Sequence, residues 1–75
     1  MQSKLAAIRR YHNKSQKEIA DLIGVDVRTY INKEQGKTQF KANEMFIIAK
    51  YFGKTIEEIF LPENFENLEV RKGVG

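Results

Sequence analysis

The fold is decided by the stretch SQKEIADLIGVDVRTY, which occupies positions 15–30. Ser15 is followed three residues later by Glu18, which makes a capping box, and each of these side chains can satisfy a free backbone amide at a helix start. Apolar residues then recur at helical spacing until Gly24, which supplies a left-handed stop. We therefore predict a helix over 16–23 with an inward face of Ile19, Ala20, Leu22 and Ile23.

A second helix follows almost at once. Asp26 is a good N-cap, and its charge suits the positive end of a helix dipole, so a helix is expected over 27–35 that ends at Gly36. Only residues 24–26 remain to reverse the chain. A turn this short that contains glycine crosses its two helices steeply and leaves the second one projecting. Such a helix-turn-helix can place its second helix in the major groove of DNA, and Val27 and Ile31 have no obvious inward partners.

Helical spacing continues on both sides of this unit, without the alternation of a β-strand. A helix over 3–12 is expected to end at Asn13, which tolerates the left-handed conformation. Two further helices are expected over 42–52 and from the Thr55–Glu58 capping box through Phe60, before Pro62 breaks the pattern. The predicted fold is therefore all-α with five helices.

The same pattern divides the chain into a helical domain over 1–61 and a tail over 62–75, which we expect to form a dimer contact or to be disordered. By their spacing, the aromatic side chains are expected mostly in or near the core. They are Tyr11, Tyr30, Tyr51, Phe40, Phe46, Phe52, Phe60 and Phe65.

Length and composition exclude several classes of protein. At 75 residues the chain has no room for a two-domain enzyme, and without cysteine it has no disulfide framework, cysteine nucleophile or thiolate metal site. The one histidine, His12, has no second histidine near it and is expected to be half-buried at a helix end. We therefore expect no enzyme, no cofactor and no metal. Since no apolar run approaches the ~18 residues of a membrane span, we expect a cytoplasmic protein without a membrane partner.

The charge is unevenly distributed. The net charge is +3, but residues 1–56 carry eleven basic and five acidic side chains, which gives +6, whereas residues 57–75 carry two and five, which gives −3. A basic body suits a polyanionic partner, and an ordinary solvated surface is the alternative. The acidic end is a candidate contact for a protein partner.

The joint spacing of these helices, their two capping boxes and their three helix-ending glycines resembles the Cro/phage-repressor helix-turn-helix family, also called the xenobiotic-response-element type. The resemblance covers about 1–61, and the residues that carry it are Leu5, Ile8, Arg9, Ser15 through Asp26, Thr29, Tyr30, Glu34, Gly36, Lys37, Glu44, Met45, Ile48, Ala49 and Thr55 through Phe60. It implies a lambda-repressor-like domain that binds double-stranded operator DNA as a Cro-like transcriptional repressor, at the nucleoid of a prokaryote or in a phage context.

The resemblance also assigns roles to individual residues. Base reading falls on Val27, Arg28, Ile31 and Asn32 of the second helix. The two apolar residues suit thymine methyl groups, Arg28 suits guanine, and Asn32 suits adenine. Phosphate contacts are expected from Gln16, Lys17, Thr29, Lys37, Thr38, Gln39 and Lys41. The alternatives are that Val27 and Ile31 pack internally and that Arg28 touches only phosphate.

Other positions have structural roles or depart from the family pattern. The resemblance implies a partly buried salt bridge between Arg9 and Glu34 that fixes the second helix on the scaffold. Lys33 stands where the family often has an aliphatic residue, and we expect its stem to cover the core while its amine reaches outward or approaches phosphate. Lys41 stands where a Thr or Ser would cap the next helix, so that cap is in doubt.

One recognition helix reads only about 4–5 base pairs, so a homodimer on two half-sites about 34 Å apart is expected. The interface is expected to be formed by Phe60, Leu61, Phe65 and Leu68. The alternative function is an antitoxin or anti-repressor module of the same fold, which would act by binding a protein.

Overall fold

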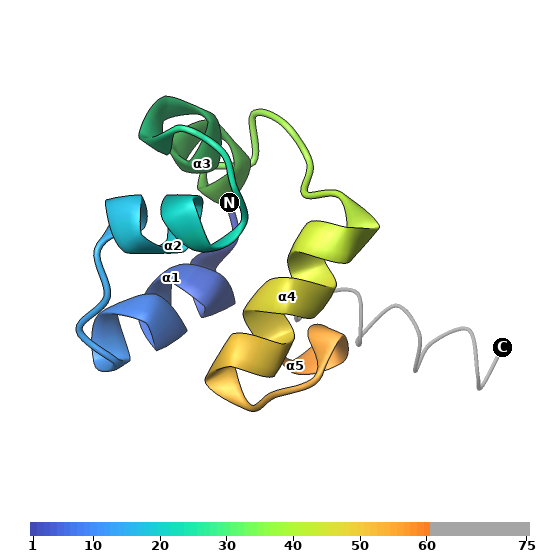
Figure 1. Ribbon diagram of the computed structural model, residues 1–75. Coiled ribbons are helices and arrows are strands. Elements are labelled where there is room, and N and C mark those ends of the chain that lie inside the picture. The colour runs from blue at the N-terminus through green and yellow to red at the C-terminus, as the bar shows by residue number, and fades with distance from the viewer. Residues whose placement is uncertain (61–75) are drawn as a thin grey trace, which may run out of the picture.

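The computed structural model describes residues 1–60, which form five α-helices and no β-strand (Figure 1). The predicted all-α fold is confirmed. The expected tail over 62–75, with Leu61 before it, lies outside the described residues. The helices in chain order are α1 (Ser3–Tyr11), α2 (Gln16–Leu22), α3 (Val27–Glu34), α4 (Ala42–Phe52) and α5 (Ile56–Phe60).

The helix ends lie within one residue of their predicted positions, because local signals set them. Asn13 has the left-handed conformation expected of it, with φ 58°. Gly24 ends α2 with φ +74°, and a Cβ added there would meet nothing within 4 Å. Glycine is therefore favoured at this turn by backbone conformation and not by lack of space. The capping box before α5 is also present: the Thr55 amide donates to Glu58 over 2.7 Å, and the Glu58 amide donates to the Thr55 hydroxyl over 3.1 Å.

The apolar core lies where all five helices converge. Tyr30 brings α3 into this core, and its ring meets Phe40 of the following loop at 5.9 Å between centroids; Phe40 in turn meets Phe60 of α5 at 5.3 Å. These edge-to-face contacts join the N-terminal and C-terminal halves of the described chain. The buried members are Leu5, Ile19, Ala20, Tyr30, Phe40, Ile48, Ala49, Ile59 and Phe60.

Several aromatic residues depart from the expected burial. Tyr11, Phe46 and Tyr51 are 83%, 58% and 46% exposed, so the prediction that they lie in or near the core is wrong. His12 is exposed as well, not half-buried, and its ring rests against Phe52 at 5.1 Å. The reason is that helical spacing places a residue on one stripe of its helix but does not say how far along that helix the neighbouring helices extend to cover it.

Lys33 corrects the expectation that its amine reaches outward. Its side chain is buried, and Nζ lies 2.8 Å from Glu44 Oε1 of α4 and donates to the Gln39 carbonyl oxygen over 3.2 Å. The same Glu44 oxygen accepts from the Lys41 amide at 2.9 Å. Glu44 thus supplies its own half of the α4 cap by accepting from the N-cap amide, while the other half has no side-chain acceptor because Lys41 carries none. Two buried charges therefore fix α3 to α4, and Lys33 is not oriented toward phosphate.

We expect Lys33→Met to lower the free energy of unfolding by about 3 kcal/mol, because it leaves the buried Glu44 carboxylate without its cation. The double variant Lys33→Met/Glu44→Leu should recover most of this loss, since it removes both charges. Urea unfolding followed by circular dichroism measures both effects. Lys37→Met, at an exposed position of the loop after α3, is the control. Equal losses in the single and double variants would contradict the ion-pair explanation.

Candidate nucleic-acid interface

The helix-turn-helix is built by caps that the sequence encodes directly. At the start of α2, the Glu18 amide donates to Ser15 Oγ at 3.0 Å, and the Ser15 amide donates to Glu18 Oε1 at 2.7 Å. At the start of α3, the Thr29 amide donates to Asp26 Oδ1 at 2.7 Å. These backbone hydrogen bonds lower the pKa of the Glu18 and Asp26 carboxyl groups. Both helix starts are therefore defined by charged or polar caps, and the Asp26 cap fixes where the turn ends and α3 begins.

Figure 1 shows α3 at the edge of the molecule, at the end away from α5. Arg28 is exposed, and Ile31 and Asn32 are partly exposed. Val27 is also partly exposed, but it packs against the core, which corrects the expectation that it lacks inward partners. Ile31 is not among the residues that pack there. The outer side of α3 thus presents a cation, an amide and an apolar group together.

The loop after α3 continues this surface. The amides of Lys37 and Thr38 donate to the Asn32 carbonyl oxygen, at 2.9 Å and 3.4 Å, so the loop begins folded against the end of α3. Lys37, Thr38, Gln39 and Lys41 are all exposed. The loop side chains expected to contact phosphate therefore lie next to the residues expected to read bases.

Ion pairing distinguishes the cations of this surface. Within residues 1–60 there are three ion pairs, and neither Arg28 nor the loop lysines take part in any of them. Lys17, by contrast, lies 2.9 Å from Asp21 one turn along α2, and both side chains are about two-thirds exposed. An exposed pair of this kind contributes little stability, but it offsets the charge of Lys17 locally. Within residues 1–60, Lys17 thus differs from Lys37 and Lys41, which were expected to contact phosphate too, in having an ion-pair partner.

Beneath the surface, the carboxylate of Glu34 holds three helices together. Arg9 of α1 donates from Nε to Oε2 at 2.9 Å and from Nη2 to Oε1 at 3.3 Å. Tyr30 donates its hydroxyl to Oε2, and Gln16 of α2 donates Nε2 to Oε1, both at 2.9 Å. The Arg9–Glu34 pair that the family resemblance implied is therefore present. The parts played by Gln16 and Tyr30 were not anticipated.

Gln16 therefore has a second partner besides the phosphate expected for it. Its side-chain amide has two N–H groups, and the bond to Glu34 uses one of them. The other N–H makes no hydrogen bond within residues 1–60 and is therefore available to the phosphate expected at the α2 start. No signal in the sequence separates these two roles, because the contact between residues 16 and 34 depends on how α2 crosses α3.

The cluster shifts the titration of its members. Burial by itself would raise the pKa of the Glu34 carboxyl, but hydrogen bonds from Arg9, Gln16 and Tyr30 outweigh it and lower that pKa. Burial and the Glu34 charge both raise the pKa of the Tyr30 hydroxyl far above its ordinary value. Glu34 therefore stays ionised and Tyr30 stays a hydrogen-bond donor at neutral pH. Such a group can orient helices, and nothing in it is arranged as a nucleophile with a base.

Metal-binding clusters and membrane-spanning helices are features of other classes of protein. Within residues 1–60, no group of three or more His, Cys, Asp or Glu side chains is placed to hold a metal ion. None of the helices described for this part of the chain is long and apolar enough to cross a bilayer.

The fold and surface define a helix-turn-helix protein, and comparison with known proteins gives the family. The sequence model of the helix-turn-helix family matches residues 5–59. A protein of Methanocaldococcus jannaschii named as an uncharacterised HTH-type transcriptional regulator is 41% identical over 66 residues, which cover 88% of this chain and 100% of that protein. The chain belongs to the Cro/C1-type helix-turn-helix family, whose members are DNA-binding transcriptional regulators.

A solved structure shows the same fold. The crystal structure of a transcriptional regulator from Listeria innocua superposes with a TM-score of 0.73 and covers 97% of this chain and 75% of that one, at 19% identity. At this identity the match shows the fold alone.

The lowered pKa of Glu34 predicts how stability depends on pH. Because its folded pKa lies below the ordinary value of 4.5, the stabilisation is present above that value and is lost as pH falls through the folded pKa. The free energy of unfolding should therefore decrease below about pH 5. Glu34→Gln should make this decrease shallower, whereas Glu57→Gln, at an exposed position outside the cluster, should retain the wild-type slope. Urea titrations between pH 7 and pH 3 measure the slopes, and an unchanged slope for Glu34→Gln would refute the assignment.

Proposed function

We propose that this protein is a Cro-like repressor that binds operator DNA as a homodimer and reads the major groove with α3. The supporting observation is the composition of one continuous surface. The exposed side of α3 carries Arg28, Ile31 and Asn32, and the adjoining loop carries Lys37 and Lys41. A helix bearing hydrogen-bonding groups beside a strip of cations suits base edges flanked by phosphates.

The contacts divide into two kinds in this proposal. Arg28 pairs with guanine, Asn32 pairs with adenine, and Ile31 meets a thymine methyl group. Val27 contributes through the part of its side chain that the core leaves open. Phosphate is held by Gln16 at the start of α2 and by the loop residues, with smaller parts for Thr29 and Lys17. The repressor would act on nucleoid DNA in the cytoplasm, by occupying its operator.

Arg28→Ala should weaken operator binding by about 1–3 kcal/mol and relax base preference at one position, since it removes a bidentate base contact. Lys37→Ala should weaken binding to all sequences alike and reduce the slope of log K against log salt by about 1. Fluorescence anisotropy with an operator and its single-base variants, at several salt concentrations, separates the two effects. Lys54→Ala, an exposed cation at the α5 start, is the control. If the Arg28 and Lys37 variants behaved alike on every sequence, the division into base and phosphate contacts would be wrong.

A two-fold homodimer predicts the form of the operator. Selection of bound duplexes from a random pool should yield an inverted repeat with half-site centres about 34 Å, or one helical turn, apart. The physical reason is that one helix contacts too few base pairs to single out a site in a genome. Footprinting on the selected duplex should show two equal protected half-sites. A single asymmetric protected site would contradict the homodimer while leaving DNA binding intact.

The dimer contact expected from the sequence needs one correction. Phe60 is 8% exposed and belongs to the core of its own chain. It is therefore not available as an interface side chain. The other three residues of that expectation, Leu61, Phe65 and Leu68, lie outside the described residues.

A further inference from the structure

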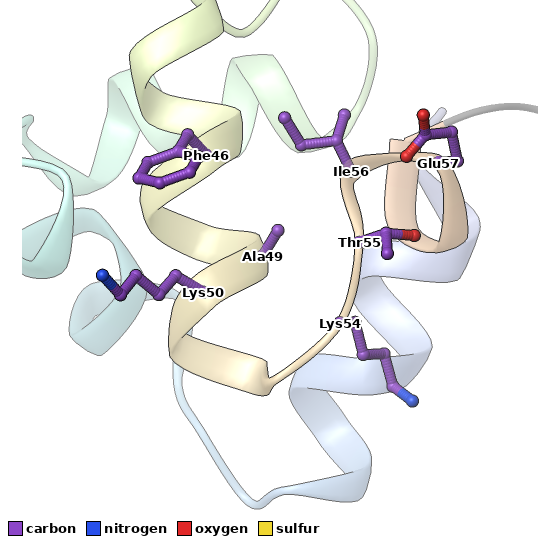
Figure 2. Close-up of a pocket in the computed structure, with 7 residues that line it drawn as sticks. All are labelled: Phe46, Ala49, Lys50, Lys54, Thr55, Ile56 and Glu57. Carbon is purple, nitrogen blue, oxygen red and sulfur yellow. The ribbon is translucent and has the colours of Figure 1, made fainter.

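A groove runs between α4 and the start of α5, away from the candidate nucleic-acid interface (Figures 1 and 2). Its volume is about 490 Å³. Figure 2 shows Ala49 projecting from α4 toward the Thr55–Ile56 segment, with the amino groups of Lys50 and Lys54 directed outward. The groove is lined by Phe46, Ala49, Lys50, Lys54, Thr55, Ile56 and Glu57.

The lining combines apolar walls with a basic rim. Phe46 is 58% exposed, although burial of a phenylalanine side chain away from water is favourable. Lys50 and Lys54 provide two positive charges, which exceed the single negative charge of Glu57. This groove suits a segment that carries large apolar side chains among acidic ones.

The chain itself continues with such a segment. Residues 61–75 follow α5 directly and read LPENFENLEVRKGVG. Phe65 and Leu68 are three residues apart, and acidic residues recur at the same spacing. On a helical turn, residues three apart share one side, so the segment can present an apolar side bordered by negative charge. The acidic residues are Glu63, Glu66 and Glu69.

The distances allow the segment to reach the groove in its own chain. Pro62 and Asn64 are residues that favour a β-turn, so the chain is able to reverse just after Phe60. The five residues of α5 span about 7.5 Å, whereas an extended chain of this segment's length spans about 50 Å. Its covalent attachment gives it an effective concentration in the millimolar range, which favours it over a second copy.

We propose that residues 61–75, the C-terminal segment, dock into the α4–α5 groove of the same chain. Phe65 and Leu68 pack against Phe46, Ala49 and Ile56, and the acidic residues face Lys50 and Lys54. Phe65 and Leu68, expected at a dimer contact, are thereby assigned to their own subunit. The proposal changes the expected dimer contact but not the DNA-contacting surface, because the groove shares no residue with the nucleic-acid interface.

The absence of cysteine in the 75-residue chain permits a direct test on this chain. Asn67→Cys introduces a single thiol that carries a nitroxide spin label between the two apolar residues. Proton–nitrogen spectra of the labelled protein should show the amide signals of Ala49 and Ile56 losing most of their intensity. The amide of Arg28, on the opposite end of the molecule, should keep its intensity. Groove signals that keep their intensity would overturn the proposal.

A mixed sample identifies which chain supplies the segment. Nitrogen-15 protein without a spin label is mixed with spin-labelled protein that lacks nitrogen-15. Intramolecular docking leaves the groove signals unchanged in this mixture. Loss of intensity at Ala49 and Ile56 in the mixture would show that a second copy fills the groove, which would overturn intramolecular docking.

A pair of variants tests the chemistry of the contact. Phe65→Ser in the labelled protein should restore the intensity of the Ala49 and Ile56 signals, because it removes the largest apolar side chain of the segment. Val74→Ser, near the chain end, should leave the signal loss in place. If Phe65→Ser also leaves it in place, the apolar contact is not what holds the segment. DNA affinity measured on the same samples reports separately on the proposed repressor function.

Discussion

The buried carboxylate of Glu34 sets the position of the helix on which the proposed function depends. Four hydrogen bonds reach its two oxygens, from Arg9, Gln16 and Tyr30. A carboxylate offers about four acceptor sites, so its capacity is filled. Removing charges from water is costly, and a buried ion pair is tolerable when its remaining acceptors are satisfied, as they are here. Within residues 1–60, no buried side-chain nitrogen or oxygen lacks a partner.

A second buried pair extends this constraint to the other side of α3. Glu34 ties α3 to α1 and α2, and the neighbouring residue, Lys33, ties it to Glu44 of α4. Adjacent helix residues point in directions about 100° apart, so the two pairs hold the helix on different sides. Such pairs add little net stability compared with apolar residues of similar size. Their effect on α3 is to fix its rotation about its axis and hence which side chains face outward.

The sequence was sufficient for the helices, because each start and stop depends on residues within one turn of it. Ser15 with Glu18, Asp26 and Gly24 act locally and can be read without knowing the fold. The interactions of Lys33 could not be predicted this way. An amine on the inward side of a helix reaches outward unless a carboxylate meets it, and Glu44 is eleven residues away in the chain. The exposure of Phe46 was missed for a related reason, since helical spacing does not reveal where a neighbouring helix ends.

Among the expected site residues, Gln16 joins the buried Glu34 carboxylate to the surface where a phosphate contact is expected. Its amide bonds to Glu34 on one side and has a second N–H for the solvent side. In the proposed complex, a phosphate held by Gln16 would be connected through the Glu34 carboxylate to Tyr30 and the axis of α3. Since Arg28 and Asn32 lie on that helix, the carboxylate that fixes its orientation would also set the distance from the proposed phosphate contact to the proposed base contacts. Phosphate contacts carry no sequence information themselves, but in the proposed complex this rigid connection would let them determine which base pairs α3 meets.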